Sequence, residues 1–256
     1  MPSRRACAIP AERNLLRPYI KAIRTFSLVL TGVGTALLFY SRMDRAARNR
    51  QVLAWAGKLM RILNIELRVS GTPPAGGAVL VANHVSWLDI HVLHSIVPVR
   101  FISKSEVRDW PLVGHLARAA GTLFIAREKK SDAIRVNQEM AAELQAGECL
   151  AFFPEGTTSD GQGMRAFYPS LFQPAVEAGC PVVPAAIRYF DLRGGPCLEA
   201  AYHGDMTLLG SFWSVVNMPG LVVQVEFLPA MSSAGLHRRE LAKQAEASIR
   251  AALGFN

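Results

Sequence analysis

The chain has 256 residues, of which 50% are apolar, and its 28 basic residues outweigh 20 acidic ones for a formal net charge of +8. This length is enough for one sizeable domain with an appendage, and the positive charge favours an anionic partner. Nucleic acid is disfavoured because few aromatic residues interleave with the basic ones and no recognition motif is present. An anionic membrane surface or a phosphorylated substrate fits the composition better.

Residues 25–41 form a run of 17 residues without a charge, and as a helix it would be about 25 Å long, at the short limit for crossing a bilayer. Six basic residues precede the run and six follow it, so the positive-inside rule favours neither orientation. We therefore expect residues 1–65 to be a membrane-attachment segment with both ends on one face, in which residues 52–63 form a partner helix. A single membrane span and a buried core helix are the alternatives.

From residue 66 onward, short apolar runs alternate with stretches of helical apolar spacing. This alternation predicts an α/β domain over residues 66–256, with a mostly parallel sheet layered between flanking helices. The helix at 132–146 is the best defined, with Ser131 as its N-cap and Gly147 at its end. The expected strands are 67–70, 78–82, 100–103, 123–126, 149–153, 182–188 and 221–227; the expected helices are 88–96, 112–119, 132–146, 171–178 and a closing helix within 236–253.

The segment Asn83–Asp89 directly follows the apolar run 78–82, so that His84 and Asp89 emerge where a strand ends and a helix begins. Five steps along a regular helix leave two residues roughly 140° apart, so the pair would not share a helix face. The side chains can meet if His84 lies in the turn and Asp89 in the first helical turn. A carboxylate on one ring nitrogen leaves the other free to take a proton from an alcohol. The alternative interpretation is a helix cap and an unrelated surface acid.

Two further segments are expected at the same edge of the sheet, because ligands of parallel sheets gather beyond the carboxyl ends of the strands. Arg127 follows the apolar run 123–126, and a guanidinium there can hold a phosphate in a bidentate manner. The segment 153–159 carries Glu155, Gly156 and Thr157, in which the glycine permits close backbone approach and the carboxylate can accept from hydroxyl groups. A solvated strand-end charge and an ordinary loop are the alternatives.

Four motifs follow one another in order: Asn83-His84-x4-Asp89, Gly121-x-x-Phe124-Ile125-x-Arg127, Phe153-Pro154-Glu155-Gly156-Thr157 and Val183-Pro184. Together they resemble the motifs of glycerolipid acyltransferases, and above all those of bacterial 1-acyl-sn-glycerol-3-phosphate acyltransferases. The resemblance covers about residues 66–230. It implies that the chain transfers a fatty acyl group from acyl-CoA or acyl carrier protein to a lysophospholipid hydroxyl, without a cofactor or a covalent acyl-enzyme.

The resemblance also implies roles for individual residues. His84 would be the general base, oriented by Asp89, while Arg127, Glu155 and Gly156 would bind the phosphate and glycerol of the acceptor. Lys104 resembles a family lysine near that phosphate, and Thr157 would help to shape the binding turn. Because both acyl donors are cytosolic, the expected location is the cytoplasmic face of a bacterial inner membrane.

The sequence also allows other acceptors and other functions. The leading acceptor is 1-acyl-sn-glycerol-3-phosphate, which would give phosphatidic acid, but residues 202–213 resemble acyltransferases that act on lyso-ornithine lipids. Asp205 and Thr207 would then select the acceptor, or they form a turn before a helix, which we favour. A non-catalytic lipid-binding membrane protein would not need the histidine and the carboxylate, and Gly-x-Ser-x-Gly, the signature of serine lipases, is absent. A thioester hydrolase is a further possibility.

No metal site is expected. His91 and His94 are three residues apart and could share a helix face near Asp89, but residues at that spacing often only line the side that faces the sheet. The four cysteines show no Cys-x-x-Cys spacing, so neither a zinc site nor a disulfide framework is indicated.

Overall fold

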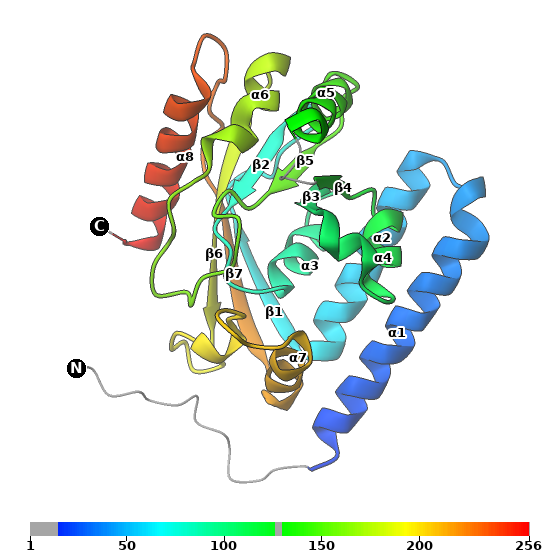
Figure 1. Ribbon diagram of the computed structural model, residues 1–256. Coiled ribbons are helices and arrows are strands. Elements are labelled where there is room, and N and C mark those ends of the chain that lie inside the picture. Colours follow the sequence, from blue (N-terminus) through cyan, green and yellow to red (C-terminus); the bar gives the residue numbers. More distant parts are fainter. Residues whose placement is uncertain (1–14, 126–129, 256) are drawn as a thin grey trace.

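A single seven-stranded sheet organises the molecule (Figure 1) in the computed structural model, which describes residues 15–125 and 130–255. The strand order is β1-β7-β6-β2-β5-β3-β4. All neighbouring strands are parallel except β6 and β7, so the prediction of a mostly parallel sheet is confirmed. The strands are β1 (Ile65–Ser70), β2 (Val79–Ala82), β3 (Arg100–Lys104), β4 (Leu123–Ile125), β5 (Leu150–Phe152), β6 (Val182–Phe190) and β7 (Leu221–Phe227).

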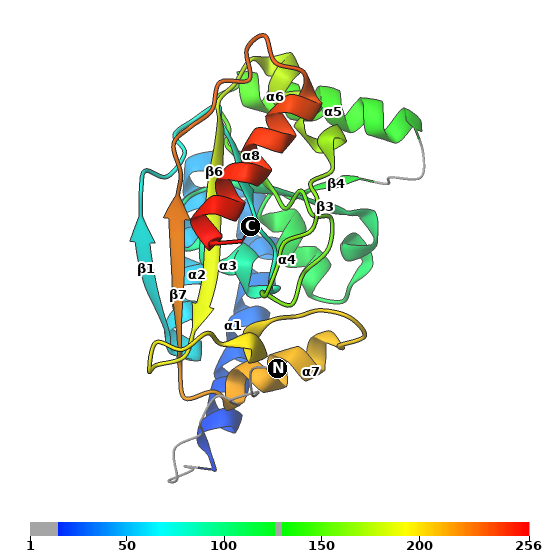
Figure 2. The same ribbon diagram turned by 90° about the vertical axis from the view of Figure 1, so that its left-hand side faces the viewer.

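Helices cover both faces of the sheet, which is why its central strands are apolar without interruption. Every residue of β2 and of β5 is buried. One core cluster joins the sheet to α2, α3 and α7, and a second joins the opposite face to α5, α6 and α8 (Figure 2). The helices are α1 (Arg17–Phe39), α2 (Arg45–Leu63), α3 (Leu88–His94), α4 (Val113–Ala119), α5 (Lys130–Gln145), α6 (Gln173–Ala178), α7 (Leu208–Asn217) and α8 (Arg238–Leu253), with short 3-10 turns at η1 (Tyr40–Arg42), η2 (Ser105–Asp109), η3 (Pro169–Phe172) and η4 (Leu198–Ala200).

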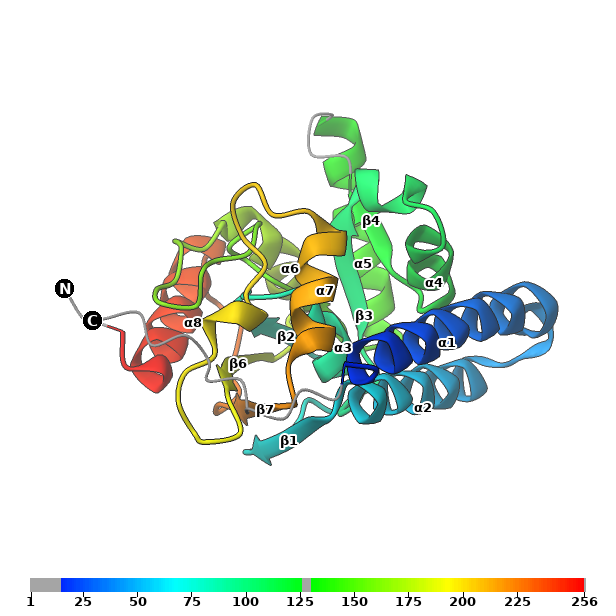
Figure 3. The ribbon, with the colours of Figure 1, turned by 90° about the horizontal axis from the view of Figure 1, so that it is seen from below.

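The two N-terminal helices form an antiparallel hairpin whose far end projects beyond the sheet (Figure 3). The predicted partner helix of the apolar run is therefore present as α2. The indole Nε1 of Trp55 donates to the carbonyl of Leu28 at 3.0 Å and joins the two helices. Lys21 Nζ donates to the carbonyl oxygens of Leu63 and Met218, at 3.0 and 2.7 Å, and so ties α1 to the ends of α2 and α7. The bond from Lys21 to Met218 therefore anchors the hairpin to the α/β domain.

One face of α1 remains exposed although it is apolar. By length and composition the helix at Arg17–Arg42 could cross a membrane, and only 11% of its most apolar window is buried. Side chains spaced along one side of a regular helix make up this face. The exposed large apolar residues of α1 and the two residues before it are Leu15, Leu16, Tyr19, Ile20, Ile23, Phe26, Leu30, Leu37, Leu38 and Phe39.

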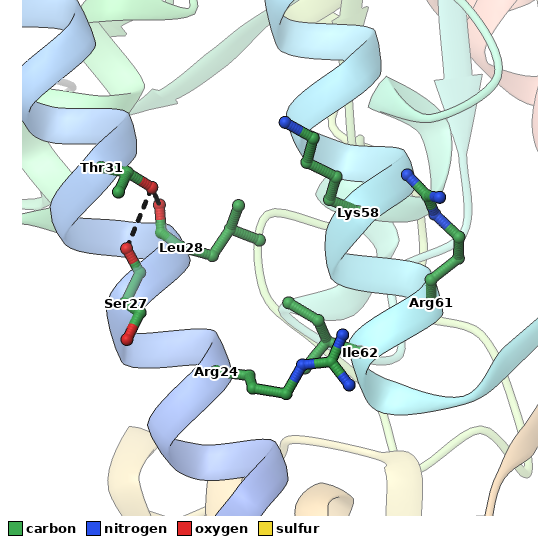
Figure 4. A pocket seen from close by; sticks show the side chains of 7 residues that line it. All are labelled: Arg24, Ser27, Leu28, Thr31, Lys58, Arg61 and Ile62. Carbon is green, nitrogen blue, oxygen red and sulfur yellow. Dashed lines mark hydrogen bonds between the residues drawn. The ribbon is translucent and has the colours of Figure 1, made fainter.

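A groove of about 440 Å³ runs between α1 and α2 beside this face (Figure 4). Three of its residues are basic, and within residues 15–125 and 130–255 none of the three forms an ion pair with a carboxylate. The groove therefore combines three positive charges with the apolar side chains of Leu28 and Ile62. Its lining residues are Arg24, Ser27, Leu28, Thr31, Lys58, Arg61 and Ile62.

Three local features differ from, or add to, the sequence-based expectations. Helix α5 begins at Lys130, so Ser131 lies inside the helix and the prediction that it is the N-cap was wrong. Gly147 does end that helical stretch, with φ of 87° and its N–H bonded to the carbonyl of Leu144. A helix was expected after the turn at Asp205 and Thr207, but its bounds were not predicted, and it is present as α7. Its N-cap is Thr207, whose hydroxyl accepts from Gly210 N at 3.1 Å, in agreement with a turn before a helix.

Candidate active site

His84 and Asp89 meet in the turn between β2 and α3. The strand ends at Ala82 and the helix begins at Leu88, so His84 lies in the turn and Asp89 in the first turn of the helix. The distance between His84 Nδ1 and Asp89 Oδ2 is 2.8 Å. Because an ionised carboxylate only accepts, Nδ1 carries the proton and Nε2 is left as an acceptor. The geometry required of a general base is therefore present.

The carboxylate of Asp89 is fully buried and is held by the turn itself. Its Oδ2 also accepts from the backbone N–H groups of Val85 and Ser86, at 2.7 and 2.9 Å. These two bonds tie the residues just before α3 to the carboxylate, whereas Trp87, the N-cap residue of α3, makes no side-chain capping bond. Asp89 is therefore not an unrelated surface acid, so that alternative interpretation was wrong, and the catalytic role of the pair stays a prediction.

The turn after β5 clamps the backbone of His84. Glu155 is 2% exposed; its Oε1 accepts from His84 N at 2.7 Å and its Oε2 from Arg165 N at 2.8 Å. Burial raises the pKa of Glu155, while the bonds from these two amides act in the opposite direction. Ser159 N donates to the carbonyl of His84 at 2.8 Å. Both oxygens of Glu155 are therefore engaged by backbone groups, and binding of an acceptor by this residue stays a prediction.

The remaining predicted binding residues follow the same edge of the sheet. Strands β2, β5, β3 and β4 are adjacent and parallel, so their carboxyl ends lie together. Lys104 is the last residue of β3 and is exposed. Gly156 has φ of 72°, a conformation that glycine adopts without strain, and Thr157 is exposed beside it. Arg127 lies outside the described residues, two positions after the end of β4.

Strand β6 supports the His84–Asp89 turn through Tyr189, a residue that the sequence-based reasoning missed, and through Asn83, the first residue of the motif, which bonds to Ile187. The hydroxyl of Tyr189 donates to Asp89 Oδ1 at 2.5 Å, and the side chain of Asn83 bonds to both the N–H and the carbonyl of Ile187, at 2.8 and 3.0 Å. Burial and the charge of Asp89 raise the pKa of Tyr189 well above its usual value, so its hydroxyl stays protonated. No spacing signal connects Tyr189 to Asp89, because they are 100 positions apart.

The two histidines of α3 belong to the packing beneath the site. His94 Nε2 lies 3.1 Å from the carbonyl of Val99, and His91 packs edge-on against the ring of Trp87. Burial lowers the pKa of His94 to about 4 and that of His91 to about 3, so both rings are neutral at pH 7. Within residues 15–125 and 130–255, no three His, Cys, Asp or Glu side chains are grouped as a metal site requires.

Comparison with known proteins gives consistent results. The profile of the Acyltransferase family matches residues 65–188, the segment that contains the motif turns and the sheet edge. A lyso-ornithine lipid O-acyltransferase of Pseudomonas aeruginosa is 40% identical over 93% of this chain and 94% of that protein. A 1-acyl-sn-glycerol-3-phosphate acyltransferase of Neisseria gonorrhoeae is 37% identical over 80% of this chain and 81% of its own length.

A solved structure has the same architecture. The 1-acyl-sn-glycerophosphate acyltransferase PlsC of Thermotoga maritima superposes with a TM-score of 0.72 at 25% identity, over 94% of this chain and 95% of that one. A buried carboxylate that orients a histidine at the edge of a parallel sheet is typical of an enzyme that activates a hydroxyl group. The chain belongs to the acyltransferase family and is an enzyme similar to the 1-acyl-sn-glycerol-3-phosphate acyltransferases.

Proposed function

We propose that this acyltransferase moves a fatty acyl group from an acyl thioester to the free hydroxyl of a lysolipid, with His84 as the general base. The observation that carries the proposal is the bond between His84 Nδ1 and the buried Asp89, which leaves Nε2 free to accept a proton. A non-catalytic lipid-binding protein would have no use for this pair. Oriented acid–base catalysis of this kind contributes about 10²–10⁴-fold to a rate.

The reaction proceeds in one transfer. The acceptor hydroxyl gives its proton to Nε2 while its oxygen attacks the thioester carbonyl, and a tetrahedral oxyanion forms. Its collapse releases the thiolate, which takes the proton from Nε2, so the histidine is neutral again and no acyl-enzyme is required. Asp89 stabilises the imidazolium ring in between, as an oriented carboxylate does in other histidine-based sites. Acyl-CoA and acyl carrier protein both supply such a thioester, and the chemistry needs no metal or cofactor.

For the acceptor, similarity over almost the entire length favours a lyso-ornithine lipid. The Pseudomonas aeruginosa relative carries that name and matches 93% of this chain, whereas the Neisseria gonorrhoeae relative matches 80%. The second candidate is 1-acyl-sn-glycerol-3-phosphate, favoured by the latter relative and by PlsC of Thermotoga maritima. Both acceptors carry an anionic group, a carboxylate in one and a phosphate in the other. Lys104 and Arg127 would bind that group and Gly156 and Thr157 would line its site.

The N-terminal hairpin would attach the enzyme to the cytoplasmic face of a bacterial inner membrane. The exposed apolar face of α1 supports this, because burying it in the acyl region contributes about 25 cal/mol per Å². The groove beside it carries Arg24, Lys58 and Arg61, which suit anionic headgroups. With the hairpin ends on one side of the bilayer, the site would meet cytosolic acyl donors and membrane lysolipids together.

The acceptor is tested by acyl transfer with the purified full-length chain. A radiolabelled acyl-CoA and, separately, acyl carrier protein are supplied with lyso-ornithine lipid, 1-acyl-sn-glycerol-3-phosphate or a neutral lysolipid. We expect a labelled diacyl product from lyso-ornithine lipid at the highest kcat/KM and none from His84→Ala. Highest activity with 1-acyl-sn-glycerol-3-phosphate would establish the second candidate, and turnover by His84→Ala would refute the mechanism.

Membrane attachment is tested by co-sedimentation with vesicles that contain phosphatidylglycerol. Replacing Phe26 and Leu30 by Asp in the exposed face of α1 is expected to release the protein while activity on detergent-dispersed substrates persists. The control variant replaces Leu192 and Leu198, two exposed leucines outside α1, by Asp as well. It should sediment like the wild type. Equal sedimentation of both double variants would exclude α1 as the attachment surface.

A further inference from the structure

Tyr189 is a buried tyrosine, 6% exposed, whose hydroxyl bonds to the carboxylate of Asp89. The two oxygens of that carboxylate have different partners. Oδ2 accepts from His84 Nδ1 and from two backbone amides of the turn, while Tyr189 is the hydrogen-bond donor to Oδ1. A buried carboxylate depends on such donors, because each missing one leaves part of the charge without compensation.

The position of Tyr189 follows from the way β6 is joined to the turn. Strand β2 pairs with β6 as far as Ala82 and Ala185, and the side chain of Asn83 then continues the ladder by bonding to the backbone of Ile187. Side chains two positions apart on a strand point to the same face, so Tyr189 lies on the same side of the sheet as Ile187. Both belong to the core cluster on the face that carries α3. The tyrosine hydroxyl is thus directed at Asp89 by strand pairing.

The ionisable groups around Asp89 come from three elements. His84 belongs to the turn after β2 and Tyr189 belongs to β6; both bond to Asp89 directly. Glu155 belongs to the turn after β5 and interacts with Asp89 electrostatically, although its own oxygens bond to backbone amides. Tyr189 is therefore the one side-chain hydroxyl that bonds to Asp89 among the described residues.

We propose that Tyr189 is a positioning residue of the acyl transfer, which holds Oδ1 of Asp89 so that Oδ2 faces His84 and which shares the negative charge of the carboxylate. The proposal rests on the proposed roles of His84 and Asp89. Two consequences follow. Without the hydroxyl, the carboxylate can rotate away from the imidazole ring, which slows proton transfer. The charge on Oδ2 also increases, which stabilises the protonated ring and requires a higher pH to obtain the neutral base.

The first test is Tyr189→Phe, which keeps the ring and removes the hydroxyl. We expect kcat to fall about ten-fold, as is usual for one charge-assisted hydrogen bond, with both KM values within about two-fold of wild type. The acidic limb of the pH–rate profile should move to higher pH. Tyr40→Phe is the control, because it removes a phenol hydroxyl in η1, between α1 and α2 and away from the motif turns. Its kcat with detergent-dispersed substrates and its pH profile should both match wild type.

A purely structural tyrosine would behave differently. Tyr189→Phe would then lower the melting temperature but leave the acidic limb of the profile in place, and that result, or an unchanged kcat, overturns the proposal. If Tyr189→Phe does not fold, fluorotyrosines with one, two and three fluorines are placed at position 189. They retain the hydroxyl and strengthen its donation stepwise, so the acidic limb should move stepwise to lower pH. If the acidic limb of the pH–rate profile lies at the same pH for all three fluorotyrosines, the proposal is overturned.

Failure of the proposed function is distinguishable from failure of this inference. If His84→Ala keeps its activity, the general-base mechanism itself is wrong and the tyrosine has no base to position. If His84→Ala is inactive while the Tyr189 variants keep wild-type kcat and pH profile, only the positioning role is excluded.

Discussion

The imidazole ring of His84 lies parallel to the phenyl ring of Phe153, with centroids 3.8 Å apart and an angle of 6° between the planes. Phe153 in turn stacks on Phe101 of β3, with the two ring centroids 5.5 Å apart. The three aromatic rings of His84, Phe153 and Phe101 are therefore stacked in a row. Packing thereby fixes the plane of the His84 ring, and the bond to Asp89 fixes the orientation of the ring within that plane. Phe153, the first residue of the Phe-Pro-Glu-Gly-Thr motif, thus orients His84 of the Asn-His-x4-Asp motif.

Phe153→Leu is expected to lower kcat by about three- to ten-fold, the range that one aromatic pair contributes, without changing either KM. Leucine fills a similar volume but offers no flat surface, so the imidazole ring would sample more orientations. Steady-state kinetics with acyl-CoA and the preferred lysolipid measures the effect. A rise in acceptor KM at constant kcat would instead show that Phe153 contacts the substrate.

Glu155→Gln separates a structural from a substrate-binding role. The amide group must turn its NH₂ towards either His84 N or Arg165 N, so one buried hydrogen bond is lost. We expect a melting temperature lower by about 5 °C and a reduced kcat, since the backbone of the base loosens. If Glu155 instead binds the acceptor, as the family resemblance implies, the acceptor KM would rise while the melting temperature stays close to that of wild type.

Lys104→Ala and Arg127→Ala are expected to raise the KM of the acceptor by about ten-fold each, because each removes one cation that would bind the anionic group. Neither should change kcat or the KM of the acyl donor by more than about two-fold. Lys243→Ala on α8 is the control, since this exposed lysine lies on a helix that covers the sheet away from the motif turns. If only the KM of the acyl donor increased, these side chains would bind the acyl donor instead of the acceptor.

Acid should destabilise the protein through His94. Burial lowers its pKa from 6.5 to about 4, so the unfolded chain binds a proton that the folded one does not in this window. The contribution of the neutral ring is complete above pH 6.5 and is lost as the pH falls towards 4, at up to about 1.4 kcal/mol per pH unit. His94→Gln keeps a donor for Val99 and cannot titrate. Its free energy of unfolding, measured with urea from pH 7 to pH 5, should therefore fall less steeply than that of wild type.

The sequence predicts the layered α/β fold well because its signals are local. Short apolar runs that end at turn residues, such as those of β2 and β5, form buried parallel strands. The expected strand 221–227 agrees residue for residue with β7, and β2 differs by one residue at its start. Ends of helices were less predictable. Helix α5 extends before Ser131, since a possible cap residue is also tolerated inside a helix.

By itself the sequence determined where the reactive groups stand relative to strand ends, and hence that His84 and Asp89 share a turn. It could not determine which distant groups complete that turn, because strand order is set by the packing of the whole sheet. Only the tertiary structure places β6 beside β2, so that Tyr189 reaches Asp89, and the β5 turn beneath His84, so that Glu155 bonds to its backbone. These contacts join residues 71 and 100 positions apart, a separation over which sequence spacing carries no geometric information.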